Sequence, residues 1–280
     1  MAGLLMSKAT LLRRRTYLLR QIVTRVSQEL ELLNLMNIFK NNNISNSRHE
    51  FKYVINESLV PVLETYLGRV GLKKDLAQKG SYPVTSLYFD TPFLSDYYDK
   101  VDGVKYRRKL RARIYQGGLS ESEDVWLEIK EKHDMSIHKI RSCVKGSHFK
   151  SLLKGVPSPE LLSDAKGDKK LSAFLYHFFM KNYRPMNIVH YYRTAYVADF
   201  HSEIRLTLDR NMSTCMWRDF VNNKSLLEFA PAKVVLEVKF KGAMPWWFKD
   251  MVGRFKLSRL SFSKYLNAVD QVRRHYPIAR

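Results

Sequence analysis

The feature that most constrains this chain is a row of basic residues at every second position between residues 105 and 113. The row consists of Lys105, Arg107, Lys109, Arg111 and Arg113. Alternate side chains of an extended strand point to opposite faces, so one face of this strand should carry all of these charges. Like charges placed side by side repel one another, which requires an anion against them. A phosphate-rich polyanion fits best, because guanidinium and ammonium groups are its usual partners in proteins.

The same alternation of charged and apolar residues recurs along the chain, for example at Glu128-Ile-Lys130 and Glu237-Val-Lys239. It predicts strands, whereas apolar residues at helical spacing predict helices. We expect strands near 48–54, 82–89, 104–115, 124–132, 137–144, 187–198, 203–209, 213–217 and 233–240. We expect helices near 57–70, 146–154, 170–182, 245–256 and 262–274, and a loop at Pro157, Pro159 and Gly167.

These patterns predict an α+β fold. The polar faces of the strands are mainly Arg, Lys and Glu, and the helices are apolar enough to cover the other side of a sheet. We therefore expect an antiparallel eight-stranded β-barrel tunnel, its charged face inward and its helices packed on the outside. The ordinary alternative is a sheet whose charged face meets water. Trp246, Trp247 and Phe248 are expected in the core or against a partner, with a membrane-facing patch as the alternative.

Composition limits the class of protein. The chain has 280 residues and a formal net charge of +21, which argues for an anionic partner. Two cysteines form neither a disulfide framework nor a metal motif, so a reducing cytoplasm is expected. No stretch reaches the roughly 18–20 apolar residues that cross a bilayer. We expect residues 1–46 to form a basic helical extension with an Asn-rich linker, and residues 47–280 to form one domain.

Eight motifs in order resemble a known family. They are RHEFKY at 48–53, SLYFDT at 86–91, YRRKLRAR at 106–113, WLEIK at 126–130, YRTAY at 192–196, RLTLD at 205–209, LEVKF at 236–240 and FSKY at 262–265. Together they resemble the VTC (vacuolar transporter chaperone) domain. This domain is the polyphosphate polymerase branch of the triphosphate tunnel metalloenzymes, also called the CYTH-like superfamily. That family has an antiparallel β-barrel tunnel, in agreement with the alternation.

The resemblance implies a metal-dependent transferase that moves the γ-phosphate of ATP onto a growing polyphosphate chain, with Mn²⁺ or Mg²⁺ as cofactor. It implies catalytic roles for Arg111, Arg113, Lys130 and Glu237, with Glu237 holding the metal. It also implies phosphate-binding roles for Lys52, Arg193, Arg205 and Lys264, and Lys109 and Lys239 are extra phosphate contacts. Glu128 is a weaker candidate for a metal or supporting role.

One departure from the wider superfamily bears on the reaction. Its triphosphatases typically begin with Glu-x-Glu-x-Lys, but the corresponding strand here reads Arg48-His-Glu50-Phe-Lys52. A cation replaces a metal-binding carboxylate, which disfavours a hydrolase built around two carboxylate-held metals. We expect Glu50 to pair with a tunnel arginine rather than with a metal.

Two other functions stay open at this point, a tunnel-fold triphosphatase or cyclase and a non-catalytic polyphosphate-binding subunit. The expected ligands are ATP and polyphosphate, and a nucleic-acid partner is not expected because no recognised motif supports one. The expected location is the cytoplasm, and association with the membrane through a partner protein stays open.

Overall fold

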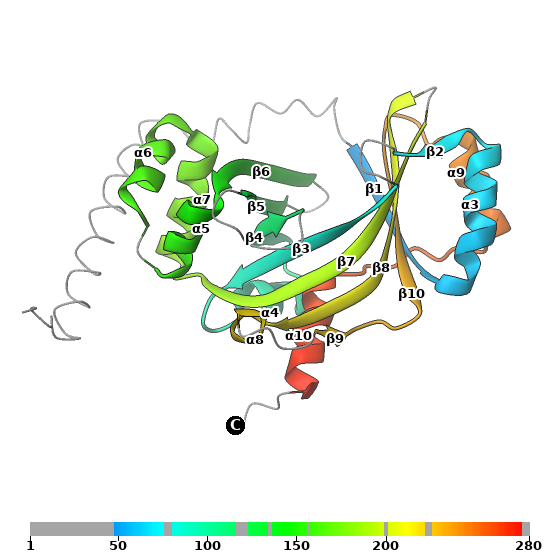
Figure 1. The fold of residues 1–280 in the computed structure, drawn as a ribbon. Coiled ribbons are helices and arrows are strands. Elements are labelled where there is room, and N and C mark those ends of the chain that lie inside the picture. Colours follow the sequence, from blue (N-terminus) through cyan, green and yellow to red (C-terminus); the bar gives the residue numbers. More distant parts are fainter. Residues whose placement is uncertain are drawn as a thin grey trace, which may run out of the picture. The chain divides into compact units, whose positions relative to one another are not determined.

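The structure is a computed structural model that describes residues 48–75, 80–115, 123–133, 136–155, 157–198, 201–221 and 226–275. The predicted N-terminal extension lies outside these residues. By contacts between residues, the chain forms two compact units. Among the described residues, one unit contains those within 89–112 and 123–185, and the other contains those within 48–88, 113–115 and 186–275. We call them the first and the second unit and describe each by itself (Figure 1).

The sheet contains long strands and two short ones. The long strands are β1 (Arg48–Asn56), β3 (Ser81–Asp90), β4 (Tyr106–Ile114), β5 (Asp124–His133), β6 (Ser136–Lys145), β7 (Arg184–Ala198), β8 (His201–Met216) and β10 (Lys233–Lys241). Their order is β1-β10-β8-β7-β3-β4-β5-β6, while β2 (Leu72–Lys74) pairs with β7 and β9 (Leu227–Glu228) pairs with β8. The α+β class and the presence of eight long strands agree with the prediction, which gave no order for the strands.

The predicted closure of the barrel needs correction, because within the described residues the sheet is open and β1 and β6 are its edge strands. The outer edge of β1 is occupied by the segment that follows α9 (Trp246–Arg254). Leu260 donates its backbone N–H to the carbonyl of Lys52 over 3.2 Å, and Arg259 forms a bridge with Tyr53. This local pairing uses hydrogen-bonding groups of β1 that barrel closure would need.

The helices are α3 (Val60–Arg69), α4 (Ser95–Val101), α5 (Gly146–Leu153), α6 (Pro159–Gly167), α7 (Lys169–Met180), α8 (Trp217–Val221), α9 and α10 (Lys264–His275), preceded by the 3₁₀ turn η2 (Glu57–Leu59). The predicted helices are confirmed, but α4, α6 and α8 were not predicted. The predicted loop at Pro159 is instead the start of α6, because Ser158 caps the helix and proline is tolerated in the first turn.

Strand β8 is one long strand rather than the two that the sequence predicts. Asn211, with φ of 52°, lies where the register against β7 shifts between His190 and Tyr192. A β-bulge of this kind bends a strand without ending it, and asparagine tolerates the left-handed conformation. The polar Asn211 interrupts the alternation in the sequence, which is why the strand appeared to break there.

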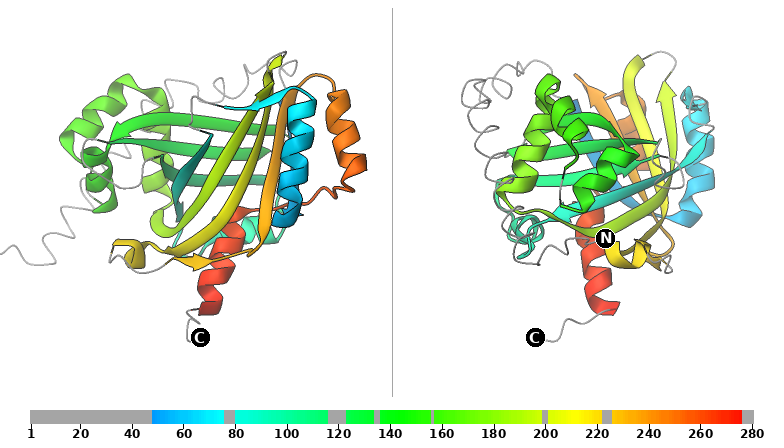
Figure 2. Two further views of the ribbon diagram at one scale, coloured as in Figure 1. Left: turned by 45° about the vertical axis from the view of Figure 1, so that its right-hand side comes forward. Right: turned by 60° about the vertical axis from the view of Figure 1, so that its left-hand side comes forward.

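In the second unit, helices α3 and α9 cover the apolar face of the β1-β10-β8 sheet, where they lie side by side (Figures 1 and 2). Leu63 and Leu67 of α3 and Trp247, Phe248 and Met251 of α9 are fully buried there. They pack on the apolar alternate positions of the strands, which are Tyr53, Leu206, Leu208, Leu236 and Val238. The predicted packing of apolar helices on the sheet is confirmed here, and it leaves the charged alternate positions on the opposite face.

In the first unit, an aromatic cluster joins the helices to Phe89. Its ring centroid lies 6.5 Å from that of Phe149 on α5, and 6.0 Å and 5.3 Å from those of Phe174 and Phe178 on α7. Edge-to-face contacts of this type add to the free energy of burial. Phe174 and Phe178 are therefore core residues of the first unit.

The first unit also buries a pair of carboxyl groups at the start of α4. Asp90 accepts backbone N–H bonds from Thr91, Asp96 and Tyr97, and so caps the helix. Asp96 is 2% exposed and accepts a hydrogen bond from the hydroxyl of Tyr183 over 2.9 Å. Burial and the nearby charge of Asp90 raise the pKa of Asp96 to about 7, although the Tyr183 hydroxyl opposes the shift.

We expect Asp96→Asn to change how the stability of the protein depends on pH. In the unfolded chain Asp96 ionises near its ordinary pKa, whereas in the folded chain it keeps its proton up to about pH 7. The wild-type protein should therefore lose about 3 kcal/mol of stability as the pH rises from 4 to 7. Asparagine can still accept from Tyr183 but does not titrate, so the variant should lack this decline. Denaturant unfolding at pH 4.5, 6 and 7.5 tests this, and equal slopes for both proteins would contradict it.

Candidate functional site

The register of the second unit's strands places charged residues in rows across one face of the sheet. Lys52 of β1 lies opposite Glu237 of β10, which in turn lies opposite Thr207 of β8. In the neighbouring row Glu50, Lys239 and Arg205 are aligned in the same way. Because the residues between them are apolar and face α3 and α9, the alternation in the sequence fixes which side carries the charges.

Glu237 is the centre of the first group of ion pairs. Its carboxylate lies 3.3 Å from Lys52 Nζ and 2.5 Å from Lys239 Nζ. Glu50 joins the same two lysines, at 2.6 Å from Lys52 and 3.7 Å from Lys239. We call these four residues the Glu237 cluster. The sequence leads us to expect an arginine partner for Glu50, and the ion pairs above join it to two lysines, one opposite it on β10 and one two residues along β1.

Asp209 of β8 is the centre of a second group, whose cations come from β7 and α10. Arg193 donates two hydrogen bonds to it, from Nε at 2.6 Å and from Nη2 at 2.7 Å. Lys264 Nζ, from the first residue of α10, lies 2.6 Å from the same carboxylate. Both cations also lie over the ring of Tyr191, at 5.3 Å and 4.8 Å from its centroid. The buried carboxylate therefore fixes the positions of two cations predicted to bind phosphate.

The electrostatics of these groups keep both central carboxylates ionised. Burial alone would raise the pKa of Glu237, but Lys52, Lys239, Arg193 and Lys264 together hold this pKa well below its usual range. Burial would also raise the pKa of Asp209, but the charges of Arg193 and Lys264 outweigh this effect and lower the pKa. Since Glu237 responds to Arg193 and Lys264, the two groups form one connected electrostatic network.

A separate cluster lies in the first unit, around the fully buried Glu128. Arg111 Nε lies 2.6 Å from its carboxylate, Lys139 Nζ lies 2.6 Å from it, and Arg141 Nε lies 3.5 Å from it. Arg141 also stacks on Trp126, with its guanidinium carbon 3.6 Å from a ring centroid. In this Glu128 cluster three cations surround one carboxylate, and the Arg141 and Lys139 side chains keep about a third or more of their surface exposed, at 34% and 41%.

The remaining predicted site residues lie at different distances from these clusters. Lys130 is half-buried on β5 opposite Lys139 of β6, and so adjoins the Glu128 cluster. Arg205 adjoins Lys239 in the register and lies 3.4 Å from Asp75. Arg113 is buried in the second unit beside Tyr115. Lys109 is half-buried on β4, and its charge lowers the pKa of Asp96 against the larger effect of burial, which raises it.

The row of cations on β4 converges only in part. Arg111 joins the Glu128 cluster, but Arg107 turns back and donates to the carbonyl of Val104 at 2.7 Å. Lys105 is exposed and precedes the first residue of β4. The row of cations therefore predicted strand β4 correctly. The cations are spread along this strand, so its length limits which of them can reach the buried carboxylate of Glu128.

Four site residues were missed by the sequence reasoning. Asp209 and Asp75 hold Arg193 and Arg205, and Lys139 and Arg141 surround Glu128. Lys139 and Arg141 carried the signal of alternation around Ile140, and Asp209 shared a face with Arg205 in its motif. Asp75 carried no such signal, because it lies just after the short strand β2 and meets Arg205 only in the fold.

A divalent cation fits the Glu237 cluster when a bound ligand supplies the rest of its coordination. Within the described residues, no group of three or more His, Cys, Asp or Glu side chains is arranged to hold a metal. Glu237 offers an ionised carboxylate, and hard cations take oxygen ligands while retaining water or phosphate oxygens. Glu237 can therefore supply one metal ligand, and the others would have to come from a bound phosphate or from water.

The charged face thus defines a class of protein, an antiparallel α+β protein whose buried carboxylates hold clusters of lysine and arginine side chains. The VTC domain family model matches residues 47–273. The chain belongs to the VTC domain family, and the resemblance found in its motifs is confirmed.

Comparison with solved structures gives distant likenesses. The bh2851 protein of Bacillus halodurans has a TM-score of 0.45 and 10% identity, covering 79% of this chain and 96% of that one. HpAC1 from Hippeastrum, described as having a dominant triphosphatase activity, has a TM-score of 0.49 and 13% identity, covering 81% and 97%. The Mimivirus capping enzyme triphosphatase has a TM-score of 0.33 and 11% identity, covering 82% and 96%.

No curated protein sequence matches the chain. In the part of the chain that the structure describes, no helix is both long enough and apolar enough to cross a membrane.

Proposed function

We propose that this protein is a polyphosphate polymerase that transfers the γ-phosphate of ATP to the end of a polyphosphate chain with the help of Mn²⁺ or Mg²⁺. Membership of the VTC domain family supports the proposal. The chemistry also suits the residues, because phosphoryl transfer depends mainly on positioning and on charge stabilisation. The terminal phosphate of the acceptor is already anionic, so little help from a general base is needed.

The observation that carries the proposal is the surplus of cations around the buried carboxylates. Three cations meet Glu128, and four cations share Glu50, Glu237 and Asp209. Partly buried cations gathered in this way make a favourable environment for an anionic ligand. A chain of phosphates supplies several negative charges at regular spacing and would neutralise such a surplus.

Thr207 gives independent support for a ligand on the charged face. It lies between Glu237 and Ala195 across the strands and is 5% exposed. In the described part of the chain its hydroxyl oxygen has no hydrogen-bond partner. A buried hydroxyl without a partner is unfavourable, and a phosphate oxygen or a bound water would satisfy it.

We assign roles to residues as follows. Arg111 and Arg193 hold phosphate oxygens with their guanidinium groups, and their orientation is fixed by Glu128 and Asp209. The other phosphate contacts are Lys52, Lys109, Arg113, Lys130, Arg205, Lys239 and Lys264. Glu237 holds the metal, which when bound would neutralise charge on the transferred phosphoryl group.

A triphosphatase is the second candidate, because Glu50 and Glu237 share the same two lysines and so place two carboxylates in one cluster. Three features favour the polymerase. Arg48 occupies the position of the first carboxylate of the hydrolase signature, Lys52 binds Glu50 at 2.6 Å, and Lys239 adds a second cation. These cations favour retention of a polyanionic product over its release. We further infer that the protein acts in the cytoplasm.

The test is to incubate the purified full chain with ATP and Mn²⁺ and to resolve the products by phosphorus NMR. We expect condensed-phosphate resonances to grow together with ADP, and chelation of the metal to stop both. Inorganic phosphate or pyrophosphate as the main product would replace the polymerase with the triphosphatase. Tight binding of added polyphosphate without turnover would leave a binding subunit instead.

A further inference from the structure

The turn between β10 and α9 in the second unit exposes large apolar side chains to solvent. Trp246 is 72% exposed and Met244 is 46% exposed. The next two residues of the helix, Trp247 and Phe248, are fully buried in the core on the sheet. The sequence left a core role and a membrane-facing role open for this aromatic segment, and the structure gives its members different environments.

Basic side chains surround this turn. Lys241 at the end of β10 and Lys249 and Arg254 on the outer side of α9 are all exposed. The nearby acid, Asp250, accepts a hydrogen bond from the Tyr66 hydroxyl over 2.9 Å and pairs with Arg254 Nε at 3.3 Å, so three basic groups and one acidic group leave a net charge of +2 here. We call Met244, Trp246, Lys241, Lys249 and Arg254 the Trp246 patch.

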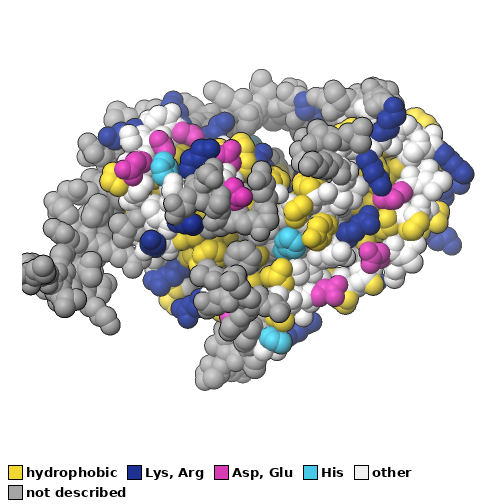
Figure 3. Space-filling model, viewed as in Figure 1, with side chains coloured by type: hydrophobic (Ala, Val, Ile, Leu, Met, Phe, Trp, Pro, Cys, Tyr) yellow, Lys and Arg dark blue, Asp and Glu magenta, His cyan; other side chains and the backbone are white. Residues whose placement is uncertain are grey.

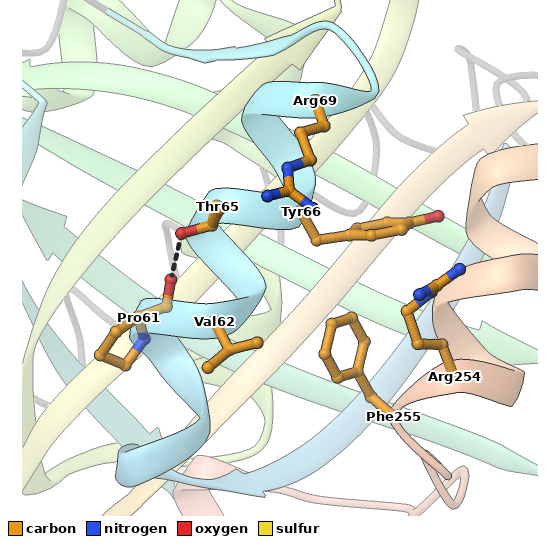
Figure 4. A pocket seen from close by; sticks show the side chains of 7 residues that line it. All are labelled: Pro61, Val62, Thr65, Tyr66, Arg69, Arg254 and Phe255. Carbon is orange, nitrogen blue, oxygen red and sulfur yellow. Dashed lines mark hydrogen bonds between the residues drawn. The ribbon is translucent and has the colours of Figure 1, made fainter.

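The surface next to the Trp246 patch is also apolar with a basic rim. A groove of about 540 Å³ runs between α3 and α9, where Val62, Tyr66 and Phe255 provide apolar surface and Arg69 and Arg254 provide charge (Figure 4). Val62 is 58% exposed. In Figure 3, yellow apolar and dark-blue basic side chains lie together over the side that carries α3 and α9.

We propose that the Trp246 patch docks on an anionic lipid surface. Tryptophan favours the boundary between headgroups and acyl chains, where its ring is buried and its N–H stays hydrated. Lysine and arginine beside such a residue gain from the negative potential of an anionic leaflet. A soluble polyanion would engage the cations but would leave Trp246 and Met244 in water. A lipid surface satisfies both kinds of side chain, and this distinguishes the proposal from a second phosphate site.

The test is co-sedimentation of the full chain with vesicles of phosphatidylcholine alone and with vesicles containing 30% phosphatidylserine. Trp246→Ala is compared with Phe93→Ala, which removes an aromatic side chain that is 85% exposed in the first unit. Lys249→Glu is compared with Lys233→Glu, which makes the same change of charge at an exposed position of β10. The matched pairs are needed because a chain with a net charge of +21 binds anionic vesicles through other surfaces as well.

We expect binding to vesicles with phosphatidylserine only. Trp246→Ala and Lys249→Glu should each weaken it about tenfold, since the first removes the ring that enters the interface and the second replaces an attracted cation with a repelled anion. The control variants should change it less than about threefold. On binding, the emission of the wild-type protein should shift to the blue, and Trp246→Ala should lose this shift. Three results would overturn the proposal: no vesicle binding, equal binding to both lipids, or equal effects of Trp246→Ala and Phe93→Ala. Each would do so even if the patch were found to bind a protein.

Discussion

Replacing Glu237 with glutamine is expected to reduce metal-dependent polymer synthesis by about 10²–10³-fold, because the carboxylate is the metal ligand of the proposed reaction. Glutamine has nearly the same shape and can still accept a hydrogen bond from Lys52 or Lys239. The variant should therefore fold, while the residual activity should no longer depend on the concentration of Mn²⁺. Initial rates of ADP formation, measured over a range of Mn²⁺ concentrations, provide the test.

The low pKa of Glu237 predicts how the metal dependence of the reaction should vary with pH. Its neighbouring cations hold this pKa well below the usual value, so Glu237 stays ionised throughout the neutral range and down into mild acid. Metal dependence should consequently persist unchanged between pH 6 and 8, with no loss from protonation of this carboxylate. Stability from the ionised carboxylate is likewise present above the unfolded pKa and is lost only as the pH falls toward the folded one.

Glu228→Gln serves as the control, since Glu228 is an exposed residue of the short strand β9. It makes the same chemical change and should leave the rate and the metal dependence intact. If Glu237→Gln kept the manganese dependence of the parent, Glu237 would have no metal role. Circular dichroism of both variants separates a lost ligand from a lost fold.

Much of the fold could be predicted because alternation is a local property of the sequence. The apolar positions of β1, β8 and β10 face α3 and α9, as the pattern at Leu236 and Val238 requires. Alternation assigns a residue to a face but says nothing of the pairing between strands. Leu260, which pairs with the edge of β1, lies more than 200 residues from that strand in the sequence. The failure of the sheet to close at β1 could therefore not be predicted from local alternation.

The site was predicted as a set of residues rather than as an arrangement. Lys52, Glu237 and Lys239 come together because β1 and β10 pair in one register, and Lys264 reaches Asp209 from the start of α10. The sequence motifs named the cations together with Glu50, Glu128 and Glu237, but not Asp209, which holds Arg193 and Lys264. Asp209 and Glu128 each fix the cations around them, and only the fold shows that they are buried.

Replacing Arg111 with alanine is expected to reduce polymer synthesis by roughly 10²–10³-fold, because its guanidinium group would no longer stabilise charge on the transferred phosphate. The fold should survive the change. Glu128 is fully buried, yet it keeps Lys139 at 2.6 Å and Arg141 at 3.5 Å as counter-ions after Arg111 is gone. The loss of stability should therefore be about 1 kcal/mol, below the 3–5 kcal/mol that a fully unpaired buried charge would cost. Urea unfolding and initial rates on the same samples separate the two effects.

Two variants on the same strand determine whether the effect belongs to Arg111 itself. Arg107→Ala removes a cation of the same strand that donates to the carbonyl of Val104, and should leave the rate nearly unchanged. Arg111→Lys keeps the charge but cannot bind a phosphate bidentately as a guanidinium group does, and it should recover only part of the activity. If Arg107→Ala lowered the rate as much as Arg111→Ala, the cations of β4 would act through their summed charge alone. The placement of Arg111 by Glu128 would then have no part in catalysis.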